Sequence, residues 1–103
     1  MQIERSELEK EIIYMVAGSL SGMPDSAPRF FNQISSELTE IKKDLIFDFQ
    51  KLLFIDSMAI GLLVGLLIKG NQLKIKVQIR NARPLILDIL ESSRLKKMFP
   101  DLY

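Results

Sequence analysis

The sequence contains no cysteine and no histidine, and these two absences exclude most catalytic and metal-binding chemistry. Without cysteine there is no disulfide and no thiolate nucleophile, which is compatible with a reducing compartment, and we expect a cytoplasmic protein. Without histidine the chain lacks the commonest general base, and the two absences together remove the usual ligands of zinc. We therefore expect no metal site, no cofactor and no enzymatic activity.

Excess charge of one sign and long hydrophobic runs are also missing. The 14 basic and 13 acidic residues leave a net charge of +1, which gives no electrostatic reason to expect nucleic acid or an anionic membrane surface as a partner. The first residues are acidic and polar, unlike a signal peptide. Asp56 interrupts the most apolar stretch, and the uncharged part from Met58 to Ile68 is shorter than the roughly 20 residues of a spanning helix. We expect a buried helix there and no membrane insertion.

The composition is that of one globular domain. The chain has 103 residues, of which 48% are hydrophobic and 26% are charged, so residues 1–103 are expected to form a single domain. Runs of β-branched and aromatic residues predict strands at residues 11–17, ending at Gly18, at 45–49 and at 73–80. Apolar residues at helical spacing, with capping residues before them, predict three helices. The helices are expected to start at Asp25 or Ser26, at Ser57 and at Arg83, the second ending at Gly70.

The two ends of the chain are less regular. Residues 95–100 predict a turn of helix followed by a strand, and residues 1–8 fit either an edge strand or a frayed arm. Between the ends, strands alternate with helices, and this order predicts an α/β fold with a parallel or mixed sheet of four to five strands. In the stretch 73–80 apolar and polar residues alternate, so one face of that strand should be wet. Helices mainly on one face of the sheet would explain this pattern.

The most informative segment joins the second predicted strand to the second helix. Asp56 and Ser57 stand where that helix must begin, directly before its apolar run. A hydroxyl at a helix N-terminus can cap the helix, and the N–H groups and dipole of the first turn favour an anion. Ser57 is therefore either a structural N-cap or a site that can carry a phosphate. Asp56 is either a capping or solvated carboxylate, or a residue that positions the hydroxyl or touches a partner.

The second helix is apolar nearly all round. Helical spacing places Ile60, Leu63, Val64 and Leu67 on the core side. Another side is expected to face outward and to form a contact surface for a partner or for a second copy of the chain, and it carries Met58, Ala59, Leu62 and Leu66. Gly61 and Gly65 would let another backbone approach this helix closely. The alternative is that residues 95–103 fold over this side.

Four segments together resemble the STAS domain, the family named for sulphate transporters and anti-sigma factor antagonists. Gly18 to Leu20 is similar to the end of the family's early strand, Asp48 and Phe49 to a later strand end, residues 54–61 to its central Asp-Ser motif, and residues 81–95 to its closing helix. The resemblance implies that Ser57 is phosphorylated by a serine-kinase anti-sigma factor and restored by a phosphatase. It also implies that the unmodified protein binds the anti-sigma factor and frees the sigma factor.

The sequence departs from the family pattern at three positions. Met58 and Ala59 replace a small residue and a glycine after the serine, and Ser21 stands where many antagonists carry an acid that helps partner binding. We therefore keep two functional hypotheses. The first is an anti-sigma factor antagonist switched at Ser57; the second is a non-phosphorylated STAS adaptor subunit of a transport or signalling complex. Catalysis by the Asp56–Ser57 pair is disfavoured because the sequence supplies no histidine base between nucleophile and acid.

Overall fold

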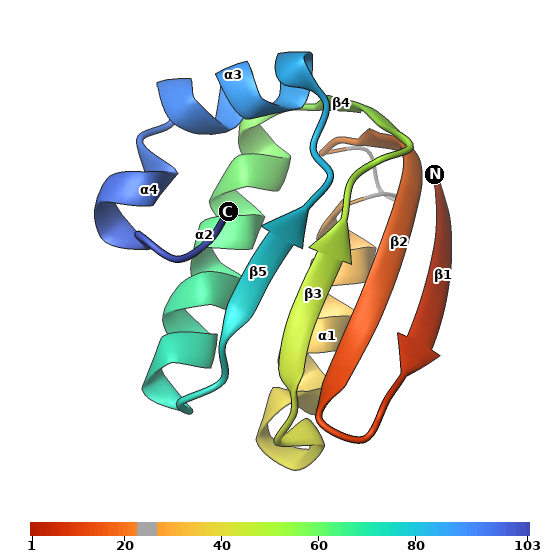
Figure 1. The fold of residues 1–103 in the computed structure, drawn as a ribbon, viewed down its shortest axis with the longest axis vertical. Coiled ribbons are helices and arrows are strands. Elements are labelled where there is room, and N and C mark those ends of the chain that lie inside the picture. Colours follow the sequence, from red (N-terminus) through yellow and green to blue (C-terminus); the bar gives the residue numbers. More distant parts are fainter. Residues whose placement is uncertain (23–26) are drawn as a thin grey trace.

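The computed structural model describes residues 1–22 and 27–103, which form a five-stranded mixed sheet and four helices. The predicted α/β class, with helices mainly on one face, is confirmed, and Figure 1 shows α1 and α2 together behind the sheet. The elements in chain order are β1 (Gln2–Glu7), β2 (Glu11–Leu20), α1 (Ala27–Ile41), β3 (Asp44–Asp48), β4 (Leu52–Ile55), α2 (Ser57–Gln72), β5 (Val77–Arg80), α3 (Pro84–Ser92) and α4 (Leu95–Met98).

The sheet is organised around β2, which has three partner strands. The order is β1-β2-β3-β5, and β4 pairs with β2 off this path. Strand β1 runs antiparallel to β2, whereas β3 and β4 run parallel to it along its first and last residues respectively. The register shifts at Gly18, whose φ of 90° lies in the left-handed region that favours glycine. Because of this bulge, β2 pairs first with β3 and then with β4. The strand continues past Gly18 to Leu20, so its predicted end at Gly18 is wrong.

The core lies between the sheet and the two long helices. Alternate residues of β2, namely Ile12, Tyr14 and Val16, are buried, and they face the apolar side of α1. Phe47 is central, because its ring lies 5.7–6.1 Å from those of Tyr14, Phe30, Phe31 and Phe49. Burial of a side chain of this size contributes roughly 1.5–3 kcal/mol to folding.

The end of α2 differs from the prediction. The helix continues to Gln72, and Gly70 is a buried residue inside it. A Cβ at Gly70 would lie 3.3 Å from the carbonyl oxygen of Ile75, which shows that the returning chain packs directly on this glycine. Residues 73–76 form the reversal, with Lys74 at φ 60°, so the strand predicted for 73–80 begins only at Val77. Its predicted two-sidedness holds, because Ile79 is buried and Arg80 is exposed.

The structure also decides the segments for which the sequence allowed more than one interpretation. Residues 1–8 supply the edge strand β1, and β4 is a strand that the sequence prediction missed. The start of the first helix was predicted at Asp25 or Ser26, which lie outside the described residues. The predicted helical turn near residue 95 is α4, whereas no strand follows it in the described chain; instead Ile79 N–H donates to Leu102 O at 2.7 Å. Within the described ranges, none of the helices combines the length and apolarity needed to cross a membrane.

Candidate functional site

The site is the start of α2, and Asp56 shapes it. Strand β4 ends at Ile55, and Asp56 N–H donates to Leu20 O at 3.1 Å, which ties this point to the end of β2. Asp56 is the N-cap of α2: its Oδ1 accepts the N–H of Ala59 at 2.9 Å. Its Oδ2 accepts the N–H of Gly22 at 2.8 Å, from the segment that follows β2. One carboxylate therefore joins two parts of the chain that are 34 residues apart in sequence.

The electrostatics of Asp56 follow from these bonds. The N–H of Ala59, then that of Gly22 and that of Met58, stabilise the charged carboxylate and lower the pKa of Asp56, against a smaller opposing effect of desolvation. Both oxygens accept backbone N–H groups, and within the described residues no hydrogen bond joins the carboxylate to the Ser57 hydroxyl. The geometry therefore fits a positioning role for this carboxylate.

Ser57 is the first residue of α2, and its side chain is exposed. The interpretation of Ser57 as the helix cap is wrong, because Asp56 occupies the cap position and provides the capping oxygen. Within residues 1–22 and 27–103 the Ser57 hydroxyl makes no hydrogen bond. The cap thus leaves this hydroxyl facing solvent at the N-terminus of a 16-residue helix.

Two further predicted site residues lie beside Ser57. Met58 is 57% exposed, and its side chain packs against Gly22, where an added Cβ would lie 2.5 Å from the methionine sulfur. Ser21 is half-buried, and its carbonyl oxygen accepts the N–H of Ala27 at 2.9 Å. The structure therefore brings Ser21, Gly22, Asp56, Ser57 and Met58 together at one end of the molecule.

The rest of the predicted contact surface is corrected. Ala59 and Leu66 are 0% and 2% exposed, and Leu62 is half-buried, so the side of α2 expected to face outward is largely covered. The reason is the position of α1, which lies alongside α2: Lys69 Nζ donates to Ser35 O of α1 at 2.5 Å. Ala59 and Leu66 belong to the core and offer no surface to a partner.

The side of α2 that faces solvent is the one that carries its two exposed glycines. Gly61 and Gly65 are exposed, a Cβ added to either meets nothing within 4 Å, and Ile68 on the same side is 46% exposed. The predicted core residues Ile60, Leu63 and Leu67 are buried, whereas Val64 is half-buried. The C-terminal segment lines a hollow with Leu67 and Asn71, so it covers a different flank and leaves the two glycines open.

Sequence reasoning missed the part played by Gly22. The N–H of Gly22 donates the second hydrogen bond to the Asp56 carboxylate, and the absence of a side chain at Gly22 leaves room for Met58. The only sequence signal was the turn-like composition around Gly22, which does not indicate a contact with a residue 34 positions later. The exposed apolar residues Leu53 and Phe54 were also missed, because β4 was not recognised as a strand of its own.

The model of the STAS domain family matches residues 2–103, and no curated protein matches the chain significantly. Among solved structures, the phosphorylated form of the Bacillus cell fate determinant SpoIIAA is 17% identical, with a TM-score of 0.75 over 93% of this chain and 86% of that chain. The unphosphorylated form of the anti-sigma factor antagonist SpoIIAA is 16% identical, with a TM-score of 0.73 over 87% and 82%.

A third structure has the same fold. The STAS domain of an antisigma-factor antagonist from Rhodobacter sphaeroides is 18% identical, with a TM-score of 0.60 over 81% of this chain and 91% of that chain. At such identities the structural likeness establishes the fold, while the family match covers nearly the whole sequence.

Proposed function

The chain belongs to the STAS domain family, and on that premise we propose that it is an anti-sigma factor antagonist-like regulatory protein switched at Ser57. In its unmodified form it binds a serine-kinase anti-sigma factor and releases the sigma factor. The kinase phosphorylates Ser57 and thereby ends the binding, and a phosphatase restores it. SpoIIAA and the Rhodobacter sphaeroides protein are both named as anti-sigma factor antagonists.

One observation carries the proposal: the helix cap at the site is provided by Asp56, which leaves the neighbouring hydroxyl of Ser57 exposed. A serine used as a cap would have its oxygen turned into the helix start, and phosphorylation would break that bond. Here a kinase can reach the hydroxyl without disturbing the cap. The exposed side chain of Met58 lies next to it and supplies an apolar contact for the same partner.

The expected effect of the phosphate follows from the hydrogen bonds that Asp56 already accepts. A phosphoserine adds about −1.5 to −2 charges. The N–H groups of Ala59 and Gly22 are bonded to Asp56, so they are not available to neutralise the new charge, and the Asp56 carboxylate repels it. A partner that covers Ser57 and Met58 must bury this dianion, at a cost of several kcal/mol. Since 1.4 kcal/mol is tenfold in affinity, phosphorylation is expected to weaken binding by about a hundredfold or more.

The test compares three forms of Ser57 with one partner. The protein is isolated from its own cells, its intact mass is measured before and after phosphatase treatment, and co-purifying proteins are identified. Serine-kinase anti-sigma factors of the same genome are then titrated with the wild type and with Ser57→Ala and Ser57→Asp. Ser57→Ala should bind like the unmodified protein, and Ser57→Asp should bind at least about tenfold more weakly. Ser36→Ala, at an exposed serine of α1, is the matched control.

Stability measurements on the same variants separate a switch from a structural serine. Because the Ser57 hydroxyl caps nothing, Ser57→Ala should change the free energy of unfolding by less than about 0.5 kcal/mol, compared with about 1 kcal/mol for loss of a serine cap. Equal affinity of all three forms for an identified kinase would contradict the proposed switch.

A second candidate is a STAS adaptor subunit of a transport or signalling complex, with Ser57 unmodified. The observation that favours it is the open side of α2, where the uncharged residues Gly61, Gly65 and Ile68 are exposed and could form a permanent contact. An adaptor would carry no phosphate in its own cells, and its partner would co-purify equally with the wild type and Ser57→Asp.

A further inference from the structure

A groove runs between the edge strand β1 and helix α1, away from the Ser57 site. We call it the β1 groove. The helices that cover the sheet do not reach over β1, whose six residues are all exposed. The lining of the groove is mixed: the exposed Ile3 and the edges of the buried Tyr14, Phe30 and Ile34 are apolar, while Arg5, Gln33 and Glu37 are polar. Toward the end of β1 the hollow continues past Arg5 and Glu37 to Glu40.

The groove adjoins an unpaired strand edge. Strand β1 is the last strand of the sheet on its side, with β2 as its partner on the other. In Figure 1 it forms the outer border of the molecule. Alternate N–H and C=O groups of such a strand point away from the sheet and can pair with an added strand. A hollow beside an open edge is the arrangement in which peptides bind by strand addition, with backbone bonds on one side and side-chain pockets on the other.

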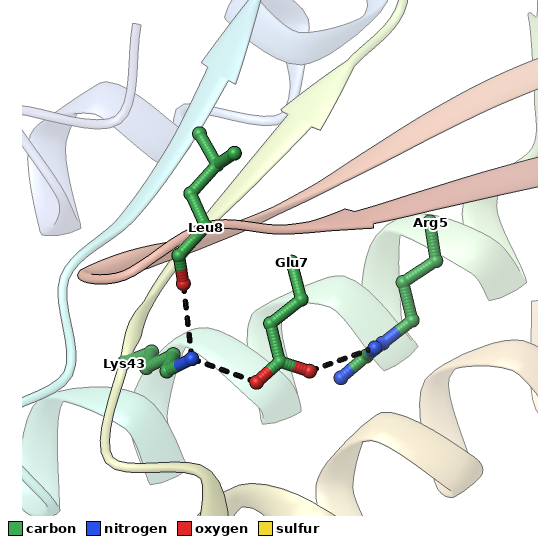
Figure 2. Close-up of polar contacts among 4 residues, drawn as sticks. All are labelled: Arg5, Glu7, Leu8 and Lys43. Atoms are coloured by element: carbon green, nitrogen blue, oxygen red, sulfur yellow. Dashed lines mark hydrogen bonds and ion pairs between the residues drawn. The ribbon is translucent and has the colours of Figure 1, made fainter.

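The strand is held in place before any partner arrives. Lys43 Nζ donates to Glu7 Oε2 at 2.7 Å and to Leu8 O at 2.9 Å, which fastens the end of β1 and the following turn to the segment before β3. Glu7 also pairs with Arg5 at 3.0 Å, and Figure 2 shows the three charged side chains converging. Arg5 in turn lies 6.0 Å from the centre of the Tyr14 ring. A preorganised edge lowers the ordering cost of binding.

The charge of the groove selects its occupant. Arg5 and Lys43 both pair with Glu7, so this cluster keeps one net positive charge. Glu37 and Glu40 form no ion pair within the described ranges, so the α1 wall of the hollow carries two unpaired carboxylates. In an extended peptide, residues two apart point to the same side and are separated by about 6.8 Å. An apolar side chain in the hollow and a basic one facing Glu37 or Glu40 can therefore come from positions i and i+2.

We propose that β1 and the β1 groove bind an extended segment of another protein, added as a strand to the outer edge of β1. The segment carries an apolar residue and, two positions on, a lysine or arginine. This surface is separate from the Ser57 site, so binding at the two does not depend on the same residues. The charged residues of β1 would by themselves serve as protection against edge-to-edge aggregation; that role accounts for charge on the strand, whereas it does not account for the hollow beside it.

The probe is a phage-displayed library of random nonapeptides, selected on the full chain, followed by titration of the best synthetic peptide into ¹⁵N-labelled protein. We expect enrichment of an apolar residue followed at i+2 by Lys or Arg, and amide shifts in Gln2–Glu7 and in the part of α1 near Glu37. Glu37→Lys should weaken the peptide about fivefold to tenfold, because attraction becomes repulsion. Glu4→Lys is the matched control: Glu4 lies on the opposite face of β1, opposite Met15, and the same charge reversal should change affinity less than about twofold.

A second series tests strand addition itself. N-methylation of alternate peptide residues should abolish binding in one register, where the N–H groups face β1, and spare it in the other. No enrichment of the i, i+2 pattern, equal effects of Glu37→Lys and Glu4→Lys, or equal effects of both methylation registers would overturn the proposal. Concentration-dependent dimerisation with amide shifts confined to β1 would overturn it in favour of a second copy of the chain.

Discussion

At the residue scale, the cap of helix α2 comes from Asp56, and the neighbouring Ser57 keeps an exposed hydroxyl. Both residues are good helix caps by type, and adjacent candidates cannot be distinguished from the sequence, because a shift of one residue in the helix start exchanges their roles. The structure decides it through Leu20, which accepts the N–H of Asp56, and through Gly22, which donates to its carboxylate. These two hydrogen-bond partners identify Asp56 as the cap, and both lie far from it in the sequence.

The charge of Asp56 gives a prediction about pH. Its pKa is lowered in the folded protein, chiefly by the N–H of Ala59. A group with a lowered folded pKa contributes stability above its unfolded pKa, about 3.9 for Asp, and loses that contribution as the pH falls through the folded value. Asp56→Asn should therefore cost roughly 1 kcal/mol at pH 7, and the difference from wild type should decrease as the pH falls below about 3.9 and through the folded pKa. Urea unfolding at pH 7 and at a series of acidic pH values measures this decrease.

Two further variants complete this experiment. Asp56→Ala should cost about 2 kcal/mol at pH 7, since the cap is lost as well as the charge. Asp88→Asn changes an exposed carboxylate of α3 in the same way and should leave the unfolding free energy within about 0.5 kcal/mol. A constant difference between wild type and Asp56→Asn from pH 7 to pH 3 would refute the role assigned to the charge.

At the element scale, periodicity predicted which elements exist, and packing decided their ends. The strand at 45–49 and the helix starting at Arg83 were predicted closely, because a short apolar and aromatic run and an N-terminal proline are local signals. Strand β4 was missed because its apolar residues, Leu52 to Ile55, run almost directly into those of α2. The side of α2 predicted to face outward lies about one-third of a turn around the helix from the side that is exposed. The error arose because a helix that is apolar all round carries no polar stripe to show which side faces solvent.

The glycines of α2 show how packing separates identical residues. Gly61 faces open space, whereas a Cβ at Gly70 would lie 3.3 Å from Ile75 O and from Val77 Cγ2. Alanine in a helix interior is favoured over glycine by roughly 0.5–1 kcal/mol. Gly61→Ala should therefore raise the free energy of unfolding by about that amount, and Gly70→Ala should not, because the new methyl group presses on the returning chain. Urea denaturation of both variants decides it, and a loss of stability in Gly61→Ala would contradict the open position.

At the scale of the whole molecule, the sheet and its helices could be predicted from the sequence, and the groove beside β1 could not. Residues 1–8 fitted a strand or an arm equally well, because charged and apolar residues mix there without a clear period. Whether this segment forms a strand depends on Lys43, which donates hydrogen bonds to Glu7 and Leu8 although it lies 35 or more residues away in the sequence. Such a contact leaves no trace in local sequence.

The fold should also survive the proposed modification. Ser57 lies on the surface, and the buried residues of α2, such as Leu63, do not face it. We expect the phosphorylated protein to keep its tertiary structure, with a change in Tm of less than about 5 °C, which corresponds to about 1 kcal/mol in a domain of this size. Thermal unfolding and near-UV circular dichroism of the two forms measure this. A loss of near-UV signal on phosphorylation would mean that the switch acts by unfolding the domain.

The bulge at Gly18 has a consequence for cooperativity. Because β2 is the common partner of β1, β3 and β4, no strand pairing in that half of the sheet can open without involving it. Sub-global openings follow contiguous units whose stability is shared. The amides of β2 are therefore expected to exchange with solvent deuterium only through global unfolding, whereas the unpaired amides on the outer edge of β1 should exchange much earlier. The fold thus combines a protected central strand with an ordered outer edge whose N–H groups remain open to solvent.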